Sequence, residues 1–353
     1  MTARVLVGTC SWTDKSLVDC NCFYPPDART PEARLRFYAS RFPIVEVDST
    51  YYGLPTDTRN AALWVDRTPA EFVFDIKAYR LLTHHPTQPD SLPKDMRDSL
   101  GDIARNKRNF YYRDLPERVR DDVWQRFADA LLPLDSAGKL GVVLFQFPPW
   151  FLPGHDNRAH IVEAKERLPQ YRIAVEFRND RWLSDLNRDR TLDFMQRNDI
   201  PLVCVDEPQG TASSVPPLSE ATSDVAVVRF HGRNREMWER KGATTGDRFD
   251  YLYSEDELRE WVSPIERLAA ATKEVHVLMN NCVRDKAVVN AGQMRILLGA
   301  LGLFCIRGSL AGNRFRRNRA PYPEKTSGRG FPASASNCVH PLTAPTGTAS
   351  RAL

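Results

Sequence analysis

The amino-acid sequence predicts an α/β protein with a TIM-like (β/α)8 barrel, built as a single domain. Eight short apolar runs rich in β-branched residues recur along the chain, and most of the gaps between them have helical periodicity. Strands that alternate with helices are typical of a parallel sheet with crossover helices. No G-x-G-x-x-G follows the first run, where Gly8-Thr9-Cys10-Ser11-Trp12 stands instead, so a closed barrel is favoured over an open dinucleotide-binding sheet.

The second predicted strand, Ile44–Asp48, combines apolar residues with two carboxylates. Its start is apolar and β-branched, yet Glu46 and Asp48 share one side of it, because strand side chains repeat every two residues. Unpaired buried charges are costly, so we expect both carboxylates to meet a partner or a ligand where the strand ends. The other predicted strands are Val5–Thr9, Phe72–Ala78, Gly141–Phe147, Ile173–Phe177, Leu202–Asp206, Val225–Phe230 and Val275–Met279.

The first predicted helix, Pro31–Phe42, has a complete start signal. Thr30 is a suitable N-cap, proline occupies the first helical position, Glu32 lies in the first turn, and apolar residues recur on one face. Similar patterns predict helices at Glu117–Leu134, Asn157–Leu168, Leu186–Asn198, Glu255–Ala271 and Lys286–Leu301.

Two gaps between predicted strands differ from the rest. The segment 210–221 is too rich in proline and serine for a helix and is predicted to loop over the barrel. The segment of about 79–139 is much longer than one crossover, and we interpret it as a lid-like insertion that ends in the helix at Glu117–Leu134.

The last part of the chain changes in composition. We assign residues 1–312 to the barrel and residues 313–353 to a basic, disordered tail, because the tail has too few apolar residues to form a core. The tail holds seven Lys or Arg and one Glu, while the whole chain has a net charge of +4, so the body is slightly acidic. Anion binding by the body must therefore depend on local placement of charge. The tail's arginine cluster could bind nucleic acid, although solvated tails are commoner.

Composition also limits the class of protein. The start of the chain lacks the layout of a signal peptide and no run of eighteen apolar residues occurs, so we expect a cytoplasmic protein that is not a membrane partner. Seven cysteines, an odd number, favour reduced thiols over a disulfide framework. Cys10, Cys20 and Cys22 suggest a metal site only weakly, because C-x-C has no matching pair or histidine, and we predict no metal site.

Several motifs together resemble the YecE-like family, also called domain of unknown function 72. The matching stretches include V-G-T-C-S-W-T at 7–13, V-E-V-D-S-T-Y-Y at 45–52, L-F-Q-F-P-P-W-F at 144–151, V-E-F-R-N-D-R-W at 175–182 and R-F-H-G-R-N at 229–234. The resemblance spans roughly residues 4 to 300 and implies a TIM-like barrel, but no established reaction. Asp19-Cys20-Asn21-Cys22 and the arginine-rich tail depart from the family pattern.

Polar residues at the ends of the predicted strands form the candidate site, because active sites of such barrels lie at the carboxyl ends of several strands. We assign acid and base roles to Glu176 and His231, with Asp206 and Glu46 as further catalytic candidates. Arginine suits phosphate or carboxylate, so basic residues are expected to clamp an anion. The expected substrate-binding residues are Lys77, Arg178, Arg229, Asp48, Trp12, Tyr51, Gln146, Asn280 and Asn281.

These residues favour an enzyme, a hydrolase or lyase that acts on an anionic small molecule such as a sugar phosphate. We expect no cofactor, although a single divalent cation is an alternative, because only His231, His84 and His85 are available near strand ends. A non-catalytic nucleic-acid-binding barrel is the rival hypothesis, with Lys and Arg on phosphates and aromatic side chains on bases. The slightly acidic body argues against it. A small-molecule sensor without turnover is the third hypothesis.

The composition of the tail predicts that truncation after Gly312 leaves the fold intact, because the removed segment should bury almost nothing. Thermal melting of the full-length and truncated chains should give midpoints that agree within roughly a couple of degrees. A much lower midpoint for the truncated chain would show that the tail contributes to the stability of the barrel.

Overall fold

The computed structural model describes residues 3–55, 57–101 and 106–300. These residues belong to one compact unit, Met1–Ile306. The predicted tail at 313–353 and the last residue of the helix predicted at Lys286–Leu301 lie outside the described residues.

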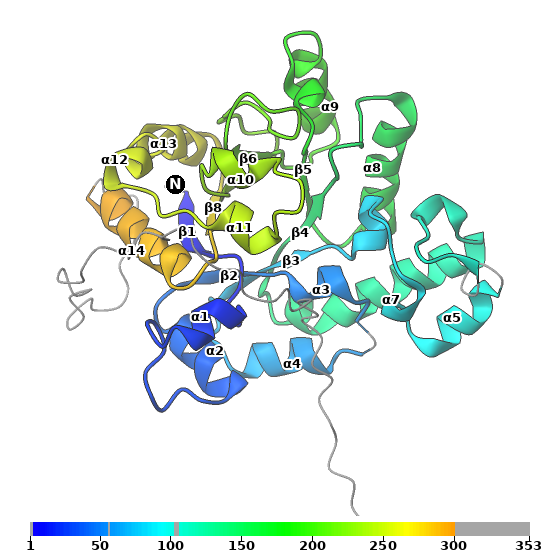
Figure 1. Cartoon of the computed structure of the whole chain (residues 1–353), viewed down its shortest axis with the longest axis horizontal. Coiled ribbons are helices and arrows are strands. Elements are labelled where there is room, and N and C mark those ends of the chain that lie inside the picture. Colours follow the sequence, from blue (N-terminus) through cyan, green and yellow to red (C-terminus); the bar gives the residue numbers. More distant parts are fainter. Residues whose placement is uncertain (1–2, 56, 102–105, 301–353) are drawn as a thin grey trace, which may run out of the picture. The chain divides into compact units, whose positions relative to one another are not determined.

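Eight parallel strands form a nearly closed barrel, which confirms the predicted fold class (Figure 1). The strands lie in the order β5-β4-β3-β2-β1-β8-β7-β6. The two ends of this order meet through one bridge between Val175 and Leu202, where the Val175 amide donates to the Pro201 carbonyl at 2.9 Å. The strands are β1 (Arg4–Thr9), β2 (Ile44–Val47), β3 (Val73–Lys77), β4 (Leu140–Gln146), β5 (Ile173–Glu176), β6 (Val203–Asp206), β7 (Val225–Phe230) and β8 (Glu274–Met279).

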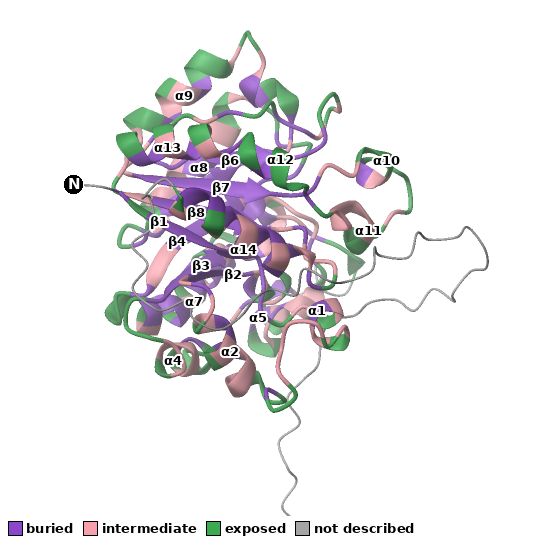
Figure 2. Cartoon of the chain, turned by 90° about the vertical axis from the view of Figure 1, so that its left-hand side faces the viewer, coloured by how far each residue is buried: buried purple, intermediate pink, exposed green. Residues whose placement is uncertain are grey.

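Helices surround the buried strands, as Figure 2 shows. The longer ones are α2 (Pro31–Ala39), α4 (Arg59–Asp66), α7 (Glu117–Ser136), α8 (His155–Arg167), α9 (Arg188–Arg197), α13 (Val262–Ala271) and α14 (Lys286–Gly299). The shorter ones are α1 (Lys15–Asp19), α3 (Ser49–Tyr52), α5 (Lys94–Leu100), α10 (Arg235–Trp238), α11 (Thr245–Phe249) and α12 (Glu255–Arg259). Short 3-10 turns lie at η1 (Arg80–Thr83), η2 (Pro89–Ser91), η3 (Tyr112–Asp114) and η4 (Asp180–Leu183).

The helix predicted at Glu255–Ala271 is divided in the structure, and this corrects the prediction. A capping box at Ser254 starts α12, but the chain breaks before α13 and turns Trp261 inward. There the buried Trp261 indole donates to Asp206 Oδ2 at 2.7 Å. This tertiary hydrogen bond is absent from any helical pattern, so periodicity could not reveal the break. Helix α4 was also not predicted.

The two unusual gaps behave differently. Between β6 and β7 the described chain forms a loop at 207–224 without a helix, as the proline-rich composition predicts. The segment 79–139 contains η1, η2, α5 and η3 before α7. An ion pair between Asp95 and Arg126 joins α5 to α7.

A tyrosine from α2 completes the join between β1 and β2. The Tyr38 hydroxyl accepts from the Thr9 amide at 2.9 Å and donates to the Ile44 carbonyl at 3.0 Å. The strands approach closely at Gly8, where an added Cβ would lie 2.0 Å from the Ile44 carbonyl oxygen. The side chain thus satisfies backbone groups that would otherwise be buried without a partner.

A polar cluster around His276 lies inside the barrel, toward the amino ends of the strands. His276 Nδ1 lies 2.9 Å from Asp75 Oδ2, and His276 Nε2 lies 2.6 Å from Glu274 Oε1. The other oxygen of Asp75 accepts from the Val142 amide at 2.9 Å. Burial alone would lower the pKa of His276, but its contacts with Asp75 and Glu274 raise it to about 9.

The raised pKa of His276 predicts a loss of stability on the alkaline side. The contribution is fully present below pH 6.5, the ordinary pKa of histidine, and disappears as the pH rises through about 9. Over this window we expect the free energy of unfolding to fall by about 3 kcal/mol.

Urea denaturation of wild type and His276→Gln at several pH values between 6 and 10 measures this term. The variant lacks the titrating group, so its stability should depend less on pH across the window. Parallel curves for the two proteins would contradict the assignment of a protonated His276.

Candidate active site at the carboxyl end of the barrel

A buried ion network crosses the barrel near the carboxyl ends of β2, β5 and β7. Arg229 donates through Nη2 to Glu46 Oε1 at 2.7 Å and through Nη1 to Glu176 Oε2. All three residues are fully buried. Arg229 Nη2 also lies 3.6 Å from the Cys10 sulfur. The two carboxylates hold the pKa of Arg229 well above its usual range although burial opposes this.

Glu176 is the most heavily bonded carboxylate in this network. Its Oε1 accepts from Gln146 Nε2 at 2.7 Å and lies 2.6 Å from Arg178 Nε. Burial alone would raise the pKa of Glu176, but Arg229, Arg178 and His231 hold it well below its usual range. Glu176 is therefore ionised near neutral pH and is a poor proton donor.

His231 is fixed at both ring nitrogens. Nε2 lies 3.2 Å from Glu176 Oε1 and 3.1 Å from Arg178 Nη2, and Nδ1 lies 2.8 Å from the Asn280 amide. Burial, followed by the positive charge of Arg178, lowers the pKa of His231 to about 3. The ring is thus neutral, and it serves to orient Glu176 and Arg178.

Arg178 connects this network to the loop after β6. Its Nη1 donates to Glu207 Oε2 at 2.8 Å, and its guanidinium lies 5.3 Å from the centre of the Trp238 ring. The other Glu207 oxygen accepts from the Val215 amide at 2.8 Å. Burial raises the pKa of Glu207 to about 8, although Arg178 acts in the opposite direction.

Lys77 and Asp48 differ from the charged residues of the inner network, which are paired with one another. Within the described residues, no other side chain forms a hydrogen bond or ion pair with the Lys77 ammonium or the Asp48 carboxylate, and the Asp48 carboxylate has only a backbone amide as a hydrogen-bond partner. Burial raises the pKa of Asp48 to about 6, with Lys77 acting in the opposite direction. Burial, and then Arg229, lower the pKa of Lys77. Both residues are only partly exposed, at the ends of β2 and β3.

Aromatic rings lie next to Lys77. Its ammonium is 4.7 Å from the centre of the Tyr51 ring, which also contacts the His85 ring at 5.3 Å. His85 in turn lies 6.0 Å from Trp150, whose side chain is 56% exposed. Together they form an aromatic rim, defined as Tyr51, His85 and Trp150. Such faces can stack on a sugar or a base.

Trp12 has a different environment from the aromatic rim. It is 6% exposed and packs edge-on against Trp64, with ring centres 5.7 Å apart. Its buried indole nitrogen has no hydrogen-bond partner in the described structure. These contacts favour a packing role for Trp12 over the predicted contact with a ligand.

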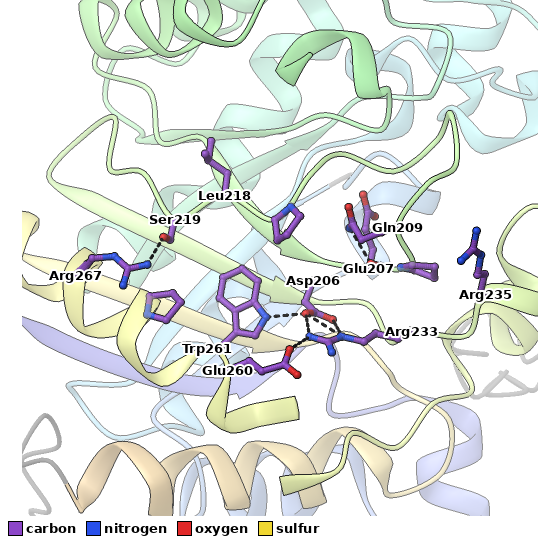
Figure 3. Close-up of a pocket in the computed structure, with 13 residues that line it drawn as sticks. Asp206, Glu207, Gln209, Leu218, Ser219, Arg233, Arg235, Glu260, Trp261 and Arg267 are labelled. Atoms are coloured by element: carbon purple, nitrogen blue, oxygen red, sulfur yellow. Dashed lines mark hydrogen bonds and ion pairs between the residues drawn. The ribbon is translucent and has the colours of Figure 1, made fainter. Parts of the chain in front are cut away.

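Two of the predicted site residues lie apart from the network. Asp206 pairs in register with Phe230, so its side chain points away from Arg229 and accepts from Arg233, Tyr253 and Trp261. It lines a separate pocket of about 530 Å³, beside the helix-free loop 207–224 (Figure 3). The Asn281 amide donates to the Tyr251 carbonyl at 2.9 Å and to Asn290 Oδ1 at 2.8 Å, which fixes the loop before α14.

The structure thus brings most of the predicted residues together but gives them different environments. Arg229, predicted as part of an anion clamp, is fully buried with Nη groups on Glu46 and Glu176, so it does not present them to a ligand. The sequence places both Asp206 and Glu207 among the polar residues at the end of the sixth predicted strand, but only Asp206 is assigned a role. The alternation of side chains along β6 separates the two residues. Val205, not Asp206, pairs with Arg229, so Asp206 faces away from the barrel interior.

No helix among the described residues is long and apolar enough to cross a membrane.

Comparisons with known proteins give one consistent result. The family described as a protein of unknown function, DUF72, matches residues 6–306. The UPF0759 protein YunF of Bacillus subtilis is 33% identical over 299 residues, covering 83% of this chain and 94% of that protein. A DUF72 family crystal structure from Enterococcus faecalis is 28% identical, with a TM-score of 0.68, covering 84% of this chain and 95% of the other. One from Thermotoga maritima is 29% identical, with a TM-score of 0.65 and coverage of 84% and 99%.

The buried network predicts a large and non-additive effect of removing its cation. Arg229→Met leaves Glu46 buried without its cation and Glu176 with Arg178 alone, so we expect it to lower the free energy of unfolding by about 3–5 kcal/mol. In a Glu46→Gln background the same substitution should cost less, because one of the two carboxylates is already neutral.

Urea denaturation of the two single variants and the double variant gives the coupling energy. The matched control is Arg197→Met on α9, which removes an exposed ion pair with Asp193 and should change stability little. Additive effects of Arg229→Met and Glu46→Gln would show that the two side chains are not coupled.

Proposed function

The chain belongs to the DUF72 family, a family of unknown function, and we propose that it is a hydrolase or lyase acting on a small anionic substrate at the carboxyl end of its barrel. The observation that carries this proposal is the pair formed by Lys77 and Asp48. A carboxyl group with a pKa of about 6 lies near an ammonium group, and neither forms a hydrogen bond to another side chain among the residues that the structure describes.

Lys77 is the cation that binds the substrate anion in this proposal. Arg229 and Arg178 are already engaged with carboxylates, whereas the Lys77 ammonium contacts only the face of Tyr51 within the described structure. A phosphate or carboxylate bound there would gain an ion pair in a partly desolvated site. Glu46 and Glu176 neutralise much of the positive charge of Arg229, so Lys77 is the main cation near the bound anion.

Asp48 is the acid or base. Its pKa of about 6 lets both protonation forms exist near neutral pH, which is what proton transfer requires. Glu176, first assigned this role from its position, is held ionised and is fully hydrogen bonded. We therefore assign Glu176 and His231 to positioning, with Gln146 and Asn280 holding them in place.

The aromatic rim supports a substrate that contains a sugar or another flat apolar face. Tyr51 contacts both the Lys77 ammonium and the His85 ring, so a sugar bound against the aromatic rim would have its anionic substituent near Lys77. Phosphorylated or sugar-containing compounds combine these two features.

Nucleic-acid binding is the second candidate function. The exposed Trp150 beside His85 is the observation that favours it, because bases stack on such side chains. Arg80, whose guanidinium lies 5.6 Å from the Tyr51 ring centre, adds a second cation for a backbone phosphate. A binder of this kind would need no acid or base, so Asp48 separates the two candidates.

The test is a screen of sugar phosphates and sugar acids for product formation by nuclear magnetic resonance. Any turnover found should fall by about 10²–10⁴-fold in Asp48→Asn, while Lys77→Gln should mainly weaken substrate binding. The matched control is Asp193→Asn, an exposed carboxylate on α9, which should leave turnover unchanged.

The pH profile gives an independent check. If Asp48 acts as a base, the rate should rise as the pH passes through about 6; if it acts as an acid, the rate should fall there. Binding without turnover that is unaffected by Asp48→Asn would support a sensor. Oligonucleotide binding that falls steeply with salt and is lost on Trp150→Ala, again without turnover, would support the nucleic-acid binder.

A further inference from the structure

Two cysteines and an aspartate gather outside the network described above. One ligand atom each from Cys20, Cys22 and Asp285 lies within 4.8 Å of the other two. The cysteines follow α1, in the segment after β1, and Asp285 precedes α14, in the segment after β8. Residues more than 260 positions apart thus converge where the first and last strands of the barrel pair.

The backbone around the cysteines explains how two thiols face one point. Cys20 caps the end of α1 in a helical conformation, and Asn21 then adopts a left-handed conformation with φ of 51°. Asparagine tolerates this conformation better than most residues, and the chain reverses there. Cys22 consequently returns beside Cys20, and its sulfur lies 3.0 Å from the Cys20 carbonyl oxygen.

The aspartate is placed independently of the cysteines. Asp285 occupies the N-cap position of α14, but its side chain does not accept from the first-turn amides, as a capping aspartate normally does. It is also buried, at 8% exposure. One oxygen of its carboxylate lies within 4.8 Å of both cysteine sulfurs.

The two segments are held together by further contacts. The Ser16 hydroxyl of α1 accepts from the Arg284 amide at 2.7 Å and lies 3.3 Å from the Cys282 carbonyl oxygen, while it donates to Asp14 Oδ1 at 2.6 Å. The three ligand residues thus belong to a preformed arrangement.

We propose that Cys20, Cys22 and Asp285 form a binding site for a soft divalent metal ion of the zinc class. Two thiolates and one carboxylate suit Zn²⁺, whereas Mg²⁺ and Ca²⁺ prefer oxygen ligands alone. Tetrahedral zinc places its ligand atoms about 3.5–3.8 Å apart, so closure by roughly 1 Å is sufficient. Both thiols lose their protons to solvent on binding, and water completes the coordination.

The spacing of the cysteines gave little reason to expect this site, because C-x-C lacked a partner in the sequence. Asp285 supplies the missing third ligand through the fold, from the opposite end of the barrel sequence. A bound ion would join the segment after β1 to the start of α14. It should therefore stabilise the barrel, since a ligand that binds only the folded chain shifts the unfolding equilibrium.

The experiment titrates the reduced, chelator-treated full-length chain with Zn²⁺ alone and with Cd²⁺ alone. Cd²⁺ is the optical probe, because its thiolate bonds absorb in the near ultraviolet. We expect saturation at one equivalent and a higher melting temperature with either ion. Both effects should vanish in Cys20→Ser and in Cys22→Ser, and Asp285→Asn should weaken binding at least about 10-fold, the lower end of what even outer-shell partners of a metal contribute.

Two controls separate this site from other thiols. Cys204→Ala removes a buried thiol of β6, and Cys338→Ser removes a thiol of the tail. Neither should change the titration. Loss of the Cd²⁺ signal in either control, or its persistence in both Cys20→Ser and Cys22→Ser, would overturn the proposal.

A gain-of-signal variant keeps the test decisive if the cysteine variants fold poorly. Asp285→Cys adds a third thiolate, so the absorbance at saturation should rise by about half and the affinity for Cd²⁺ should increase. An unchanged absorbance at saturation, with the variant folded by circular dichroism, would show that residue 285 is not a ligand. Absence of binding by wild type to either ion would refute the site.

Discussion

The contact of Arg229 with Glu46 and Glu176 is the interaction on which the rest of the site depends. One guanidinium links β7 to β2 and β5 across the interior, in a region where an unpaired charge would be strongly destabilising. Glu176 then orders Gln146, Arg178 and His231 around its second oxygen. The positions of these side chains follow from one charge balance, so the arrangement exists before any ligand arrives.

This balance separates two kinds of polar residue at the same end of the barrel. The charged residues of the inner network have each paired with an oppositely charged side chain, although Glu46 Oε2 and Arg229 Nε have no hydrogen bond in the described structure. Lys77 and Asp48 have no such paired side chain, and in the described structure they lie at the edge of that network beside the aromatic rim. Preorganised surroundings with a few unsatisfied groups are what a catalytic site requires.

Periodicity predicted the barrel well, because buried parallel strands and amphipathic helices each leave a local pattern. It could not predict partners. Asp206 and Glu207 are adjacent in sequence, yet one contacts Trp261 and the other Arg178. Likewise, Arg229 and Arg178 are similar at strand ends, and only the fold shows that the first is fully buried and the second partly accessible. Charge pairing is set by contacts between distant segments, which no local pattern encodes.

The edge between β5 and β6 is the most weakly paired edge of the barrel in the described structure. Because only one bridge, between Val175 and Leu202, joins β5 to β6 in the described structure, the barrel is close to an open sheet at this edge. Arg178 follows β5 and Glu207 follows β6, so the contact between them acts as a clasp that joins these two strands at their carboxyl ends. Burial raises the pKa of the Glu207 carboxyl to about 8, so this contact is a full ion pair only above that pH and a hydrogen bond to a neutral carboxyl below it.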